Sequence, residues 1–90
     1  MKALITITAP TVHNLKAANS FNIPVKEKMS GKIEGKQEFE TIEAALAHLK
    51  TAAKNIFNKW QNENYEEMIL NIEKYNTLSF DGARAEIELL

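Results

Sequence analysis

The chain has 90 residues, of which 44% are hydrophobic and 26% are charged, and its formal net charge is −1 at pH 7. This composition is typical of a folded domain and excludes collagen-like and disordered chains. Because the chain contains no cysteine, disulfides and thiolate zinc ligands are excluded as sources of stability. We therefore predict a single compact domain over residues 1–90, with one core built by packing.

The first segment, residues 2–9, alternates between two faces and is rich in β-branched side chains, which predicts a strand. Its inward face is expected to comprise Ala3, Ile5 and Ile7. Pro10 cannot donate a hydrogen bond to a sheet and is expected to end this strand. Thr11 then caps a short predicted helix. The side chains expected to point inward from this helix are Val12, Leu15 and Ala18.

Residues 25–40 also follow a two-residue period, with the sharply separated faces of an antiparallel sheet that has one wet side. The even positions are nearly all charged. The apolar odd positions are Val25, Met29, Ile33 and Phe39. Gly31 and Gly35 predict a β-bulge, or a hairpin that turns near Glu34 and Gly35.

Residues 42–60 form the longest periodic segment, with apolar side chains at three- and four-residue spacing for about five turns. Thr41 is the expected N-cap, and Glu43 complements the helix dipole in the first turn. The apolar stripe comprises Ile42, Ala45, Leu46, Leu49, Ala52, Ala53, Ile56, Phe57 and Trp60. We expect this amphipathic helix to pack across the sheet and to supply most of the hydrophobic stabilisation.

Residues 64–75 fit two templates. Asn64 with Glu67 three residues later resembles a capping box, which favours a helix that ends near Asn76. The helical stripe omits Leu70, however, whereas a strand would omit Ile69, so a strand stays open.

The tail, residues 83–90, alternates cleanly and predicts a strand. Asp81 and Gly82 are a strong signal for a two-residue turn, which would pair residues 77–80 with the start of the tail. The fold class predicted from these elements is α+β, with a small antiparallel sheet packed against one long amphipathic helix. The predicted order is β-β-α-(α or β)-β.

The residues that could carry chemistry do not form a recognisable catalytic or metal-binding motif. His13 and His48 lack partners at metal-ligand spacing, and His48 is expected to lie partly exposed beside the apolar stripe. Serines 20, 30 and 79 lack the setting of a nucleophile, and the three glycines lack the spacing of a phosphate-binding loop. We therefore expect a protein that is not an enzyme and that has no catalytic, cofactor-binding or metal-binding residues.

Charge is unevenly distributed along the chain, which indicates two candidate binding surfaces. Residues 1–60 contain nine lysines and five glutamates, for a net charge of +4, whereas residues 61–90 contain two basic and seven acidic residues, for −5. Folding that brings the two regions together would neutralise both, and this alternative stays open. The leading hypothesis is an acidic surface that binds a basic protein or nucleoprotein complex. Its residues are Glu66, Glu67, Glu73, Asp81, Glu86 and Glu88.

Two other functions remain alternatives. A lysine-rich strand face could neutralise the phosphates of a nucleic acid, although no aromatic side chain interleaves it. The lysines of this face are Lys26, Lys28, Lys32 and Lys36. The third function is a homo-oligomeric structural protein, in which a terminal strand at a sheet edge pairs with a second copy to form a dimer. Glu86 and Glu88 could equally prevent such pairing.

In size and general character, this small cysteine-free chain resembles accessory proteins of phages and other mobile elements, including anti-CRISPR inhibitors. The resemblance implies an inhibitor of a host protein or nucleoprotein complex, and it assigns no role to any single residue. Neither a secretory signal nor an apolar run of membrane-spanning length is present in the sequence. We therefore expect no membrane partner and a cytoplasmic location, in the host cytoplasm if a phage encodes the protein.

Overall fold

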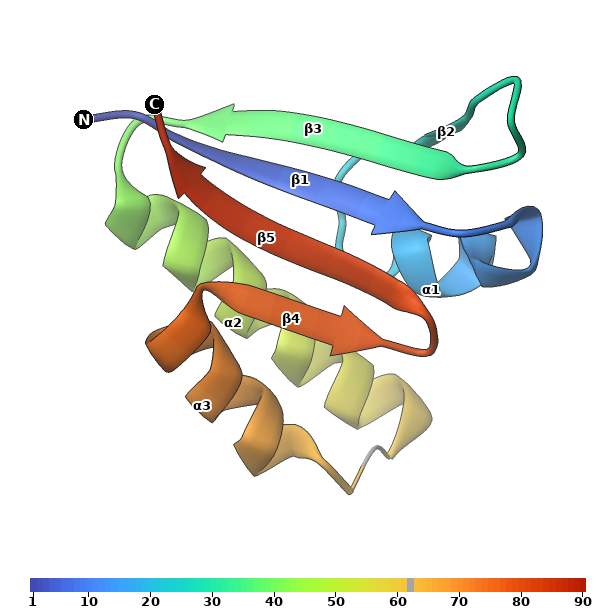
Figure 1. Ribbon diagram of the computed structural model, residues 1–90. Coiled ribbons are helices and arrows are strands. Elements are labelled where there is room, and N and C mark those ends of the chain that lie inside the picture. The colour runs from blue at the N-terminus through green and yellow to red at the C-terminus, as the bar shows by residue number, and fades with distance from the viewer. Residues whose placement is uncertain (62) are drawn as a thin grey trace.

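The computed structural model describes residues 1–61 and 63–90, and its strands form one five-stranded antiparallel sheet with the helices on one face (Figure 1). In chain order, the elements are β1 (Ala3–Ala9), a 3-10 helix (Val12–Asn14), α1 (Leu15–Asn19), β2 (Lys26–Glu27), β3 (Ile33–Phe39), α2 (Ile42–Trp60), α3 (Tyr65–Tyr75), β4 (Thr77–Phe80) and β5 (Ala83–Leu89). The strand order across the sheet is β2-β3-β1-β5-β4. The predicted α+β class, with a long helix on an antiparallel sheet, is therefore confirmed.

Strand β1 lies at the centre of the sheet, between β3 and β5. Ile5 stands opposite Gln37 of β3 and Ile87 of β5 in the strand register. The inward side chains of β1 are fully buried, as their alternation predicts: Ala3, Ile5 and Ile7. The opposite side chains of β1 are more accessible, so the sheet has one dry face and one wet face.

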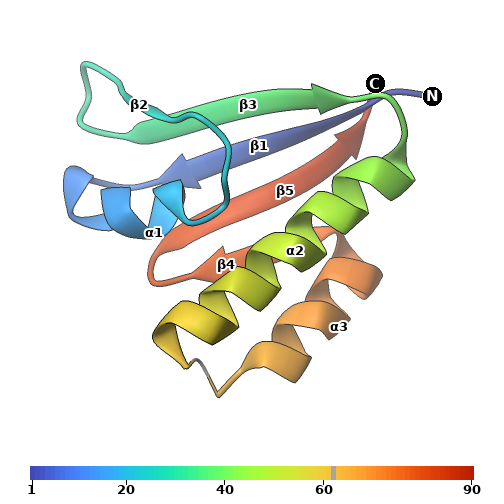
Figure 2. The same cartoon turned by 180° about the vertical axis from the view of Figure 1, so that it is seen from behind.

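Helix α2 crosses the dry face of the sheet, with α3 beside it (Figure 2). The hydroxyl of Thr41 accepts a hydrogen bond from the backbone N–H of Ala44 at 3.1 Å, which confirms the predicted N-cap. The buried side chains of α2 are Ala45, Leu49, Ala52, Ala53 and Ile56. Burial of a large side chain such as Leu49 contributes about 1.5–3 kcal/mol. Near the C-terminal end of α2, two members of the predicted apolar stripe remain partly exposed, Phe57 at 37% and Trp60 at 38%.

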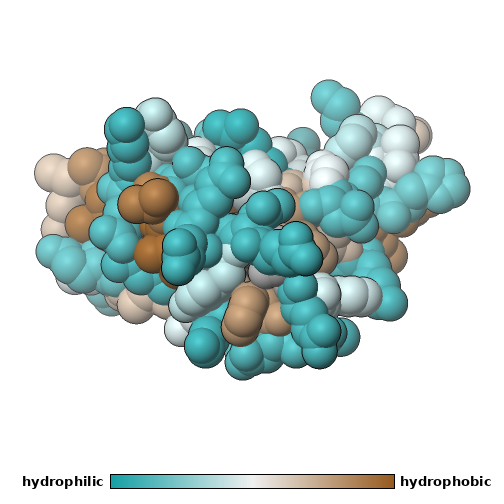
Figure 3. All heavy atoms as spheres, turned by 90° about the horizontal axis from the view of Figure 1, so that it is seen from below, coloured by the Kyte–Doolittle hydropathy of each residue, from teal (hydrophilic) through white to brown (hydrophobic). Residues whose placement is uncertain are grey.

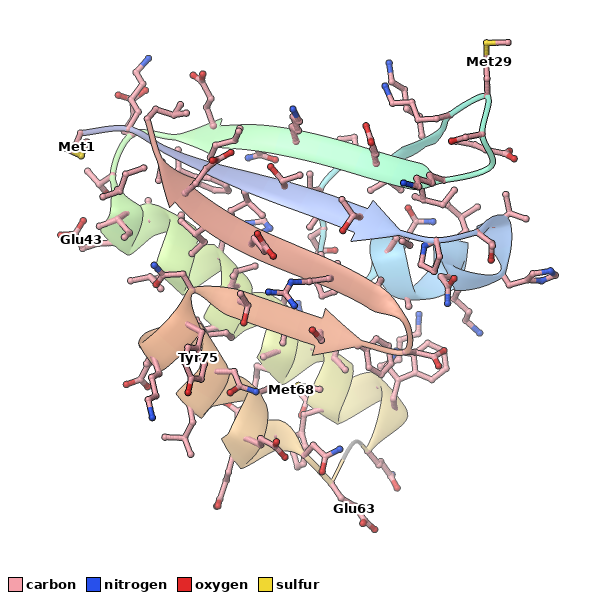
Figure 4. The ribbon with its side chains drawn as sticks, in the orientation of Figure 1. Met1, Met29, Glu43, Glu63, Met68 and Tyr75 are labelled. Atoms are coloured by element: carbon pink, nitrogen blue, oxygen red, sulfur yellow. The ribbon has the colours of Figure 1, made fainter. Side chains whose placement is uncertain are left out.

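The turn between β2 and β3 lies earlier than the sequence predicts. The N–H of Gly31 donates to the carbonyl of Lys28 at 2.9 Å, and Gly31 adopts a φ of 87°, which favours glycine. Met29 therefore stands at the tip of the turn, fully exposed and pointing away from the sheet (Figure 4), and its predicted inward position is wrong. Gly35 lies within β3, where an added Cβ would stand 2.7 Å from Cγ1 of Val25. It permits the preceding loop to approach β3 closely.

The short N-terminal helix also differs from its prediction. Thr11 caps a 3-10 turn through the N–H of His13, at 3.3 Å, and α1 follows it directly. Because a 3-10 turn has fewer residues per turn than an α-helix, the inward positions shift along the chain. Val12 and Leu15 are 44% and 39% exposed, so their predicted burial is wrong. Ala18 is fully buried, as predicted, and the segment from α1 to residue 23 also buries Ala17, Phe21 and Ile23.

The C-terminal third contains a helix and a hairpin. Residues 65–75 form α3, which settles the choice between helix and strand, and Asn76 ends it with a φ of 58°. Asn64 occupies the N-cap position, but its side chain does not make the capping hydrogen bond predicted for it. Asp81 and Gly82 have φ values of 46° and 85° and join β4 to β5, as their sequence predicts.

Candidate functional site

The six acidic residues predicted to form one surface lie in three places. Glu66 and Glu67 occupy the first turn of α3, and Glu73 lies nearer its end, on the helical side of the molecule. Asp81 lies in the β4–β5 turn. Glu86 and Glu88 lie on β5 and are exposed on the opposite, wet face of the sheet. The glutamates of α3 are therefore separated by the whole sheet from those of β5.

The acidic residues of β5 belong to a surface of mixed charge. Glu86 stands in register with Thr6 of β1, which faces Lys36 of β3 on its other side. Glu86 also forms an ion pair with Arg84, with 2.6 Å between its Oε1 and the arginine Nε. Because opposite charges alternate over this face, it lacks the single sign that would attract a charged partner.

The terminal strand β5 does not lie at a sheet edge. It pairs with β1 on one side and with β4 on the other. Its backbone groups therefore form hydrogen bonds with neighbouring strands of the same chain, and β5 is not free to pair with a second copy as the dimer hypothesis requires. The Asp81–Gly82 turn is the physical reason, because it folds β4 back along β5.

The predicted lysine face is also divided. Lys26, Lys28 and Lys36 line a shallow hollow beside β2 together with Glu34, whereas Lys32 lines a different one near Pro10. Lys28 forms an ion pair with Glu34, with 3.7 Å between its Nζ and Oε2. The hollow beside β2 has no aromatic side chain among the described residues that line it, so it lacks a platform for stacking bases.

Folding brings together a groove between α2 and α3 that the sequence interpretation missed. Its volume is about 510 Å³. Its lining residues are Lys50, Tyr65, Glu66, Ile69 and Leu70. Leu70 is 64% exposed, whereas Ile69 packs partly against the core. Seen from below in Figure 3, the molecule is mostly hydrophilic, with separate hydrophobic areas between the hydrophilic side chains.

The walls of this groove are held by ring and charge contacts between the two helices. The rings of Phe57 and Tyr65 lie 5.0 Å apart, centroid to centroid, and tilt by 39°. Nζ of Lys54 lies 5.3 Å from the Tyr65 ring centroid. Nearer the end of α3, Nζ of Lys50 lies 3.7 Å from Oε1 of Glu73. This last pair joins the basic and acidic regions of the chain, so folding partly neutralises them.

One feature of the sequence points to the groove. Leu70 is the residue that falls outside the helical stripe of residues 65–75, and an apolar side chain outside the stripe of a true helix must face solvent. Once the helix is established, Leu70 is therefore an exposed apolar residue surrounded by charged neighbours. Its position beside Tyr65 and Ile69 follows only from the packing of α3 on α2.

The histidines lie apart from this groove. Nε2 of His48 lies 2.8 Å from the carbonyl oxygen of Phe21, and its ring packs 5.2 Å from that of Phe39. His48 is half-buried, as predicted, and it ties the loop after α1 to α2. His13 is exposed in the 3-10 turn. Over residues 1–61 and 63–90, no three His, Asp or Glu side chains come together as metal ligands, and no helix has the length and hydropathy to cross a bilayer.

Comparisons of the chain with protein-family models, with curated proteins and with solved structures gave no match.

Proposed function

We propose that this protein is a protein-binding module whose α3 surface binds a basic segment of a partner protein. The observation that carries the proposal is the apolar groove formed by Tyr65, Ile69 and Leu70, whose lining is completed by one acidic and one basic side chain, Glu66 and Lys50. In this proposal an aliphatic side chain of the partner enters the groove and basic side chains on either side meet the glutamates.

The apolar part of the surface supports a docking role for physical reasons. Single exposed hydrophobic residues are common and carry no meaning by themselves. Leu70 is different because it lies at a groove whose other walls include a tyrosine and an isoleucine. Tyrosine is among the residues that dominate binding energy at interfaces, where these residues lie in well-packed pockets that exclude water. Tyr65 is already held by its contact with Phe57 in the free protein, so binding a partner costs little additional side-chain entropy at this residue.

The charge of α3 determines which sign of charge a partner should carry. Its exposed glutamates outnumber its single lysine, Lys74. They are Glu66, Glu67 and Glu73, and Glu63 precedes them, pointing away from the sheet (Figure 4). Lys50 of the groove lining pairs with Glu73, so the excess of negative charge lies at the start of α3, at Glu66 and Glu67. An excess of one sign steers association and disfavours like-charged partners, while adding little affinity. A basic protein surface fits this pattern. An inhibitor resembling phage accessory proteins would act through the same surface, by covering a basic site of its target.

A random-peptide display library is a direct test, because the groove is small enough to be filled by one short segment. We expect the native protein to enrich peptides in which an aliphatic residue is flanked by lysine or arginine. Leu70→Glu should abolish the enrichment, and Glu66→Lys with Glu67→Lys should reverse its charge preference. Met29→Glu is the matched control, since it places the same charge at an exposed apolar residue in the β2–β3 turn. The absence of enrichment, or equal enrichment with the Leu70→Glu variant, would refute the proposal.

A further inference from the structure

A second pocket lies between α1 and the last two turns of α2, and its chemistry differs from that of the α3 groove. Its volume is about 240 Å³. The side chains with which a ligand could interact are Lys16, Lys59, Trp60, Asn19, Asn22 and Asn55. No carboxylate is present among the described residues that line it. The pocket therefore combines two positive charges, three carboxamides and an indole ring. We propose that it binds one nucleotide unit of a single-stranded nucleic acid.

The indole of Trp60 provides the surface on which a base would stack. The ring lies 6.1 Å from Phe80, centroid to centroid, and tilts by 42°, so Phe80 supports it from β4. Trp60 remains 38% exposed. Stacking of a base on an aromatic side chain is worth about 1–3 kcal/mol and requires only an accessible ring face.

The two lysines already lie close to the indole. Nζ of Lys16 lies 4.5 Å from the centroid of the Trp60 ring, and Nζ of Lys59 lies 5.4 Å from it. An exposed cation–π contact is worth only about 0.5–1 kcal/mol, which is less than base stacking provides. A base can therefore displace a lysine from the ring, and the freed ammonium group can then meet the phosphate of the same nucleotide. Neither lysine forms an ion pair with the residues that the structure describes, so both charges are available.

Two features restrict the ligand. The pocket is smaller than the roughly 300–1,000 Å³ that encloses a typical small-molecule ligand, so the nucleotide is held on one side and the strand continues outside. The carbonyl end of α2 also lies here, and its partial negative charge repels phosphate. The attraction must come from Lys16 and Lys59, and each should contribute separately. The carboxamides of Asn19, Asn22 and Asn55 can both donate to and accept from base edges.

Trp60 is the only tryptophan in the chain, so its fluorescence reports directly on this pocket. We expect oligouridylate or oligothymidylate to quench its emission at low ionic strength. The affinity should fall with salt at a log–log slope of about −1.4, which corresponds to two neutralised phosphates at about −0.7 each. Lys16→Gln with Lys59→Gln should abolish this binding. Lys26→Gln with Lys36→Gln, which removes the same charge from the hollow beside β2, should leave the affinity unchanged.

A second readout uses a labelled oligonucleotide and fluorescence anisotropy. Trp60→Leu should weaken binding about 5- to 150-fold, as the loss of one stacked base predicts, and circular dichroism should show an intact fold. Binding that falls equally in both lysine-pair variants would overturn the proposal, because it would reflect the overall charge of the protein. If uridine monophosphate bound as tightly as the oligonucleotides, the ligand would not be a single-stranded nucleic acid. The absence of any quenching would overturn the site itself.

Discussion

Replacing Gly35 with alanine tests how closely the loop before β2 packs on β3. The added Cβ would lie 2.7 Å from Cγ1 of Val25 and closer still to the carbonyl oxygen of Pro24. Carbon atoms prefer a separation of about 3.5–4.0 Å. Val25 is β-branched and has few alternative rotamers, and a carbonyl cannot rotate away, so the backbone of residues 24–25 must shift.

The size of the effect follows from two opposing terms. Overpacking lowers the free energy of unfolding by about 1–3 kcal/mol. Alanine also lowers the conformational entropy of the unfolded chain, which raises the free energy of unfolding by about 0.4–1 kcal/mol. We expect Gly35→Ala to lower the free energy of unfolding by about 1–2 kcal/mol. The midpoint of thermal unfolding should then fall by about 4–16 °C in a domain of this size.

Circular dichroism during thermal and urea unfolding measures both quantities. Gln37→Ala is the control, because Gln37 lies two residues further along β3 and is exposed. Its effect should stay within about 0.5 kcal/mol. If Gly35→Ala is as stable as the native protein, the close approach of the loop to β3 is incorrect.

Substitutions at three further positions test the helices by the same urea unfolding. Leu49→Ala should lower the free energy of unfolding by about 2–5 kcal/mol, because Leu49 is fully buried under α2; a loss below about 1 kcal/mol would contradict its central place in the core. Thr41→Ala should cost about 1 kcal/mol through loss of the cap to Ala44, and Thr41→Asn should retain most of the stability. Asn76→Ala should cost about 1–2 kcal/mol, because the φ of 58° is strained for alanine; Asn76→Gly should relieve that strain, and equal stability of the two variants would argue against it.

The regular elements could be predicted because their signals are local. The alternation of Ala3, Ile5 and Ile7 matches the pleat of β1, and the stripe of α2 matches the helical period. Asp81 and Gly82 specify a turn whose backbone few other residues adopt, so the final hairpin was also predictable.

Elements set by contacts between distant segments could not be predicted in this way. The alternation placed Met29 inward because β2 and β3 share one period across the turn, but the positive φ of Gly31 turns the chain two residues later. The role of Gly35 depends on Val25, which packs against it because the β2–β3 hairpin brings the two residues together. Both follow from the pairing of strands, which the alternation of a single segment does not encode.

The candidate surfaces also depend on contacts between distant segments, which the sequence alone does not reveal. The six acidic residues are close in sequence, but α3 and the wet face of β5 lie on opposite sides of the sheet, so proximity along the chain did not give one surface. Leu70 was visible as a residue outside its stripe, whereas its neighbours in the groove come from the packing of two helices. Trp60 and Lys16 likewise meet only because α1 lies beside the end of α2.

The most direct test of the proposed protein-binding surface is an NMR titration of the 15N-labelled protein with a basic peptide selected by display. Binding in the groove predicts that the largest chemical-shift changes fall on α3, at Tyr65, Ile69 and Leu70, and on the facing side of α2 near Lys50. Changes concentrated on the wet face of the sheet, around Glu86 and Glu88, would contradict the proposal, because they would place the partner on the opposite side of the molecule.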